Sequence, residues 1–172
     1  MLATHNNAEN RYTTIRKAVL HEVNQELMRN QSHSVQAKLI DVSALNASKK
    51  WNNSSHRQVD WDWVSGYDTF KFRYPKRFEM ALWHNRQLIS LSLGRPSYQG
   101  TKLRLDYIEA NPDKPADLKV FQSTFIAMVA YAQAIGAEEL RVMNPVNEQV
   151  RKYYERFGLT YISKSDYLYI KL

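Results

Sequence analysis

The chain has 172 residues, 44% hydrophobic and 24% charged, a composition typical of a soluble globular protein, and we expect a single domain over residues 1–172. It has no cysteine, which excludes disulfides and cysteine-ligated metals, and its five histidines form no HxH or HExxH pair, so we expect no metal. No apolar run is long enough to span a bilayer and no secretory signal is visible, so we expect a cytoplasmic protein without a membrane partner. The net charge of +7 fits binding of an anionic cofactor or of nucleic acid, and it equally fits a role in solubility alone.

Helical periodicity opens the chain after ten polar residues, which we expect to be frayed. Apolar positions recur in steps of three and four between Tyr12 and Leu27. This spacing places them on one face and predicts an amphipathic helix over about residues 10–30.

The next segments carry weaker patterns. Ser34–Val42 has the alternation of a strand, and the polar residues 43–58 predict a loop with at most a short helical turn. Residues 60–77 combine aromatic and basic side chains, and we expect an irregular segment there.

Three strands are expected in the middle of the chain, at Phe78–Trp83, Gln87–Gly94 and Thr101–Ala110. The segments that join them are short turns. Because such connections are too short for a parallel crossover, the three strands should form an antiparallel meander.

A helix should follow the proline-containing break at Asn111–Pro115. Asp117 is its expected N-terminal cap and Gly136 suits its C-terminal end. A short, apolar, central strand is then predicted at Glu139–Met143.

Another helix is predicted to open at Asn144 and end near Gly158, where glycine permits a left-handed turn. It should pack on the sheet through Val146, Val150, Tyr153 and Phe157, with Tyr154 at the edge of that stripe.

Two short strands, 159–163 and 167–172, complete the predicted order. A meander followed by a strand–helix–strand unit predicts a mixed α+β or α/β protein. Its central, mostly antiparallel, twisted sheet should have about six or seven strands flanked by helices.

The C-terminal third resembles the GNAT superfamily of acetyl-CoA-dependent acyltransferases. In that family a strand leads into a helix that opens at an asparagine, with a tyrosine seven residues later and a glycine–apolar pair after it. This chain matches in identity and spacing at Asn147, Tyr154, Gly158 and Leu159. The likeness is looser over residues 78–172, and residues 1–77 match only in length and element type. The chain also resembles small acetyltransferase-like proteins carried on bacterial mobile elements.

The resemblance implies the GNAT fold and an acetyl-CoA-dependent N-acetyltransferase, whose acceptor amine attacks the thioester directly. The acceptor could be a small molecule, a peptide or protein, or an aminoacyl-tRNA. Tyr154 is the expected proton donor to the leaving thiolate. Glu109 is preferred to Asp106 as the base, because the two should point to opposite faces of one strand and Glu109 lies nearer its splayed end. Backbone N–H groups near Ile108–Ala110 would polarise the thioester oxygen.

The family's glycine-rich phosphate loop has no counterpart here, because residues 111–120 contain two prolines and no glycine. Lysine charges could replace the missing backbone donors. The expected cofactor-binding residues are Ile108, Ala110, Lys114, Leu118, Lys119 and Asn147.

Trp61, Trp63 and Tyr67 are the expected substrate-binding residues, with an aromatic plug of the core as the alternative reading. The loss of the loop glycines leaves a second class of function open, a non-catalytic GNAT-fold protein that binds nucleic acid or protein. The basic and aromatic cluster at 71–77 would suit RNA, and exposed sheet edges would allow a homodimer.

Overall fold

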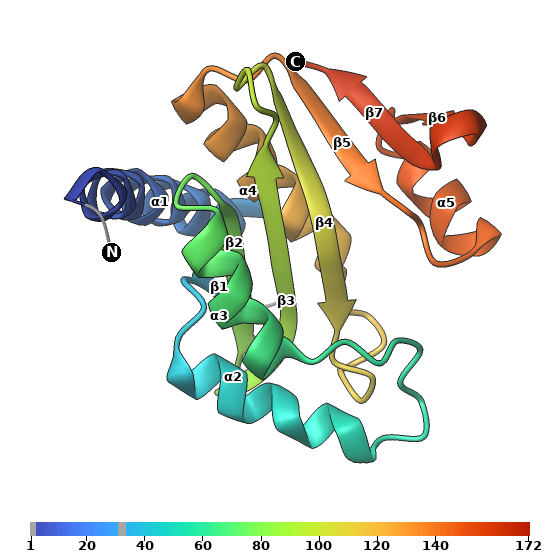
Figure 1. The fold of residues 1–172 in the computed structure, drawn as a ribbon. Coiled ribbons are helices and arrows are strands. Elements are labelled where there is room, and N and C mark those ends of the chain that lie inside the picture. Colours follow the sequence, from blue (N-terminus) through green and yellow to red (C-terminus); the bar gives the residue numbers. More distant parts are fainter. Residues whose placement is uncertain (1–2, 31–33) are drawn as a thin grey trace.

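The computed structural model describes residues 3–30 and 34–172, which form one seven-stranded sheet with helices on both faces (Figure 1). The strand order is β1-β2-β3-β4-β5-β7-β6. Neighbouring strands are antiparallel except β4 and β5, which are parallel. The predicted mixed, mostly antiparallel sheet is therefore confirmed. The strands are β1 (Val35–Lys38), β2 (Phe78–His84), β3 (Gln87–Pro96), β4 (Lys102–Ala110), β5 (Glu139–Met143), β6 (Thr160–Ile162) and β7 (Tyr167–Lys171).

Each face of this sheet is covered by its own set of helices. Helices α1, α4 and α5 contribute to the larger apolar cluster and pack on one face. Helix α2, the short 3-10 helix η1 and α3 contribute to the smaller cluster on the other face. Burial of apolar surface on both faces fixes the layers. The helices are α1 (Ala3–Asn30), α2 (Val42–Ser48), η1 (Lys49–Asn53), α3 (Trp63–Arg73), α4 (Val120–Ile135), α5 (Glu148–Glu155) and the 3-10 turn η2 (Ser163–Ser165).

The first 77 residues contain more helix than the sequence patterns predict. Helix α1 begins at Ala3 rather than near residue 10, and α2 with η1 replaces the expected loop at 43–58. Helix α3 occupies the segment expected to be irregular. Aspartate caps were the missed signals: Asp41 accepts a hydrogen bond from Ala44 N, and Asp62 accepts from two backbone N–H groups at the start of α3.

In the second half the elements agree closely with expectation, apart from the starts of two helices. Helix α5 begins at Glu148, with Asn147 as its cap, rather than at Asn144. Lys119, not Asp117, precedes α4, and its side chain makes no capping bond. Gly136 and Gly158 adopt the predicted left-handed conformation, with φ of 76° and 86°.

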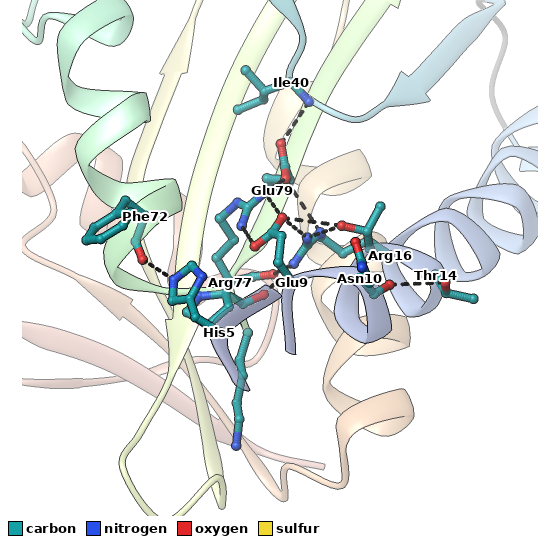
Figure 2. Close-up of polar contacts among 12 residues, drawn as sticks. His5, Glu9, Asn10, Thr14, Arg16, Ile40, Phe72, Arg77 and Glu79 are labelled. Atoms are coloured by element: carbon teal, nitrogen blue, oxygen red, sulfur yellow. Dashed lines mark hydrogen bonds and ion pairs between the residues drawn. The ribbon is translucent and has the colours of Figure 1, made fainter. Parts of the chain in front are cut away.

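A buried ionic network joins helices from both faces of the sheet (Figure 2). Arg16 of α1 and Arg77, each only 2% exposed, share the carboxylate of Glu9. Arg77 donates to both Glu9 oxygens at 2.8 and 2.9 Å and to Glu79 Oε1 at 2.7 Å. Burial opposes ionisation of Glu9, but its hydrogen bond to Arg77 and the charges of both arginines hold its pKa below the usual value.

The other oxygen of Glu79 extends this network to α3. It accepts from the Tyr67 hydroxyl at 2.7 Å and from Ile40 N at 3.0 Å. Tyr67 also donates to Ile40 O, so the expected substrate residue holds α3 to the sheet. Arg77 is also buried, so within the basic cluster at 71–77 it is unavailable to an RNA partner.

Strand β4 carries a bulge that alters which side chains share a face. Leu93 pairs with Tyr107 and Gly94 with Leu105, so Asp106 is the extra residue. Asp106 and Glu109 consequently both contact residues on the α3 side, through Arg95 and Trp63. The expectation that they point to opposite faces is wrong, because strict alternation holds only in an unbroken strand.

Gly94 is required opposite this bulge, since a Cβ there would lie 2.2 Å from Arg104 O. Gly94→Ala should therefore destabilise the protein by about 1–3 kcal/mol through overpacking. Gly66→Ala in α3 is the matched control: nothing lies within 4 Å of its new Cβ, and it should stabilise by about 0.5–1 kcal/mol. Urea unfolding measures both, and shifts of the same sign would contradict this account.

Glu9 should make stability depend on pH in mildly acidic solution. Because its pKa is lowered in the folded state, its contribution is present above the unfolded value of about 4.3 and is lost as pH falls through the folded value. Glu9→Gln should cost about 1–2 kcal/mol at pH 7 and flatten the decline below pH 5. Glu22→Gln, an exposed change on the same helix, should leave the pH profile of unfolding unaltered, and an unaltered profile in Glu9→Gln would refute the assignment.

Candidate functional site

The two parallel strands part after a short paired stretch. Pairing runs from Lys102 with Glu139 to Leu105 with Val142, while β4 continues to Ala110. Figure 1 shows the two arrows diverging. A cavity of about 490 Å³ fills the opening, lined by the ends of both strands, the first turns of α5 and residues 56–61.

Tyr154 projects from α5 into this opening. Its ring stacks on Phe121 of α4 with centroids 4.0 Å apart, and it is the buried residue of the helix at 8% exposure. Of the expected packing stripe, Val150, Tyr153 and Phe157 pack against the apolar cluster, whereas Val146 lies before α5 and is 49% exposed. No described residue hydrogen-bonds the Tyr154 hydroxyl, and burial raises the pKa of this phenol, which keeps it protonated.

Asn147 positions Tyr154 indirectly. Its Oδ1 accepts from Val150 N at 2.8 Å, so it caps α5. The residue that lines the opening is Asn144, in the left-handed conformation with φ of 47°. Asn147 thus shapes the start of the helix, and its expected contact with the cofactor stays a prediction.

The expected cofactor residues on β4 and the following loop do gather beside the opening. Ile108, Ala110 and Lys114 line both it and a neighbouring depression at the start of α4, which Leu118 and Lys119 also line. Lys114 Nζ donates to Leu118 O at 2.9 Å. Burial, with the charge of Lys119, lowers the pKa of Lys114.

The loop after β4 uses several of its own backbone donors. Asp113 N donates to the Asn111 side chain, Lys114 N to Asn111 O and Leu118 N to Pro115 O. Prolines 112 and 115 have no N–H to offer. Anion binding here would depend on the two lysines and the first turn of α4.

Glu109 is 5% exposed and held by three donors. Its Oε1 accepts from Arg57 Nε at 2.7 Å, and its Oε2 accepts from Arg57 Nη2 at 3.1 Å and Trp63 Nε1 at 2.6 Å. Arg57 also donates to Trp61 O and to the Asn52 side chain. Sequence reasoning missed Arg57, because a lone arginine in a polar segment carries no local signal.

A second cavity, of about 690 Å³, lies between α3 and the sheet. It meets the first at Trp61, Asp106, Tyr107 and Asn144, which line both. Trp61 packs edge-on against Tyr107, whereas Trp63 and Tyr67 are buried in the apolar cluster under α3. All three expected substrate residues line the second cavity, and Trp61 also lines the first.

The described residues offer neither a metal-binding cluster nor a membrane-spanning helix. No group of three or more histidine, aspartate or glutamate side chains there could hold a metal ion. Within residues 3–30 and 34–172, no helix is long and apolar enough to cross a bilayer.

Comparison with solved structures identifies the fold. A GNAT-family acetyltransferase from Staphylococcus aureus superposes with a TM-score of 0.62 and 9% identity, covering 80% of this chain and 99% of its own. The ribosomal-protein-S18-alanine N-acetyltransferase from Escherichia coli gives 0.58 and 10%, covering 80% and 93%. A variant of the spermidine N-acetyltransferase SpeG from Vibrio cholerae gives 0.56 and 14%, with the same coverage. No protein-family model and no curated protein matches the sequence. The chain therefore has the fold of the GNAT acetyltransferases.

The Arg57–Glu109 pair should be strongly coupled, because Glu109 is buried and its charge needs Arg57. Arg57→Met should destabilise by about 3–5 kcal/mol. The double variant with Glu109→Gln should be less destabilised than the sum of the two single variants, since no bare carboxylate remains. Chemical unfolding of the four proteins measures the coupling, and additivity within about 0.5 kcal/mol would refute it.

Proposed function

We propose that this chain, which has the GNAT fold, is an N-acetyltransferase that transfers the acetyl group of acetyl-CoA to an amine. The observation that carries the proposal is the position of Tyr154, a buried phenol without a hydrogen-bond partner among the described residues, at the opening between β4 and β5. The hydroxyl oxygen is not among the buried unpartnered atoms of the described residues, so it reaches the cavity, where a ligand can contact it.

The parted strands suit an extended, amide-containing arm such as the pantetheine of coenzyme A. Beyond Leu105, β4 no longer pairs with β5. Its backbone around Ile108 and Ala110 can therefore pair with a ligand in the manner of an added strand. The same N–H groups could polarise the thioester oxygen as negative charge develops.

The diphosphate of the coenzyme would lie beside the start of α4. Lys114 and Lys119 line that depression and supply positive charge, and the helix N-terminus adds a favourable partial charge. Because the backbone loop is largely bonded to itself, this site would bind through charge and its affinity should fall with salt.

In the proposed reaction the neutral amine attacks the thioester carbonyl carbon, and the carbon–sulfur bond breaks. The leaving thiolate takes its proton from the Tyr154 hydroxyl, and the nitrogen of the new amide releases a proton to solvent. The Tyr154 phenolate then takes a proton from solvent, which restores the donor. Burial raises the pKa of Tyr154 and so keeps on its hydroxyl the proton that is to be transferred. Glu109, already held by Arg57 and Trp63, is better suited to positioning the wall of the site than to accepting a proton.

A non-catalytic GNAT-fold binding protein is the second candidate. The self-bonded, glycine-free loop after β4 favours it. That function needs no phenol at the opening, so a Tyr154 variant separates the two candidates.

Tyr154→Phe keeps the ring that stacks on Phe121 and removes the proton donor. Its kcat, measured by thiol release from acetyl-CoA with a panel of amines, should fall about 10²–10⁴-fold, with affinity for the coenzyme nearly unchanged. Tyr161→Phe, a matched loss of a hydroxyl bonded to Asp166 on the far strands, should leave kcat unaltered. Undiminished turnover in Tyr154→Phe, or no turnover by the wild type with any amine, would contradict the proposal.

A further inference from the structure

We infer that the acceptor is a small amine that also carries a carboxylate or phosphate on an aromatic or apolar body, bound in the cavity between α3 and the sheet. That this amine is the acceptor of the acetyl group rests on the proposed function. The ligand chemistry itself follows from what lines this cavity.

The charged lining has an excess of arginine. Arg73, Arg95 and Arg104 face two carboxylates, Asp62 and Asp106, which leaves a net charge of one positive. The Asp62 carboxylate is already engaged at the start of α3, where it accepts from Ser65 N and Val64 N. A polycation such as a polyamine would meet repulsion in this cavity, whereas an oxyanion would meet attraction.

The arginines retain donors for such an oxyanion. Arg104 uses Nε and Nη2 on one oxygen of Asp106, at 2.7 and 2.5 Å. Arg95 places Nε 3.5 Å from the other oxygen and gives Nη1 to the Tyr74 hydroxyl. Both side chains are about one-third exposed, and Arg95 Nη2 and Arg104 Nη1 have no partner among the described residues. Guanidinium groups with a free edge bind planar carboxylates and phosphates well.

Aromatic rings form the walls between these charges. Trp61 contacts Tyr107, Phe70 contacts Tyr107 at 6.2 Å between centroids, and Phe70 contacts Tyr74 at 4.8 Å. The Arg95 guanidinium lies 4.3 Å from the Tyr74 ring centroid. A planar or apolar body can stack between such rings, and the cavity volume of about 690 Å³ suits a small molecule.

One buried acceptor atom points to where the amine would lie. Asp106 Oδ2 is buried and accepts no hydrogen bond, its nearest cation being Arg95 Nε at 3.5 Å, and the Asp106 side chain is only 9% exposed. Asp106 lines both cavities. An N–H of the acceptor at this oxygen would stand at the junction with the opening between β4 and β5, and its oxyanion would reach Arg95 and Arg73.

Matched amines test the inference. Phenylalanine and phenethylamine differ in the carboxylate, and O-phosphotyramine and tyramine differ in the phosphate; spermidine represents polycations. Calorimetric titration without coenzyme should show each anionic amine binding roughly tenfold to a hundredfold more tightly than its partner, as a charge-assisted hydrogen bond provides. The values of kcat/KM should follow the same order. The pair with the larger difference in affinity shows whether the cavity prefers a phosphate or a carboxylate.

Arg73→Gln and Arg95→Gln should each abolish most of that preference. Lys71→Gln removes one charge from the same segment outside the cavity lining and should not affect it. Equal effects in all three variants, tighter binding of spermidine or phenethylamine, or no binding by any of the five amines would overturn the inference. Failure of acetyl-CoA to bind would instead remove the proposed function and leave the amine titrations decisive for the cavity.

Discussion

The site depends on one departure from regular sheet pairing, the parting of β4 from β5 beyond Leu105 and Val142. The extra residue at Asp106 bends β4 away at this point. The bend is tolerated because Gly94 on the next strand lets the backbone approach closely. The same displacement frees the end of β4 for a ligand and places Asp106 between the two cavities, so the sheet's irregularity generates both halves of the proposed site.

Buried ion pairs between segments distant in the sequence fix the walls around this opening. Glu79 ties Tyr67, and hence α3, to the network that Arg16 and Arg77 form with α1. Glu109 does the same for the segment before α3, through Arg57. These charges are stabilising only while paired, since a buried ion without its partner costs several kcal/mol. The cavity between α3 and the sheet is thereby built from the paired strands β3 and β4 and from a helix that these buried contacts hold against them.

Local patterns predicted the elements well where local chemistry decides them. The meander, the glycine ends of α4 and α5, and the approach of Tyr154 to β4 follow from alternation, turn residues and a family spacing. The bulge at Asp106 was not predictable, because it depends on Gly94 of the neighbouring strand β3, whose backbone closely approaches the Arg104 carbonyl. Arg57 was missed for the same reason, since its partner Glu109 lies 52 residues away. Helix α3 was missed although Asp62 offered a cap, because aromatic content obscured its helical spacing.

The central claim is that the opening between β4 and β5 binds acetyl-CoA despite a loop without glycine. Thermal unfolding of the protein as acetyl-CoA is titrated tests it most directly. Binding to the folded state should add about 2.7 kcal/mol of stability at a hundred times Kd. The gain should shrink with salt and in the Lys114→Met/Lys119→Met variant, but not in Lys152→Met, whose ammonium pairs with Glu148 on the outer side of α5. A melting temperature that stays constant up to millimolar acetyl-CoA would contradict the account.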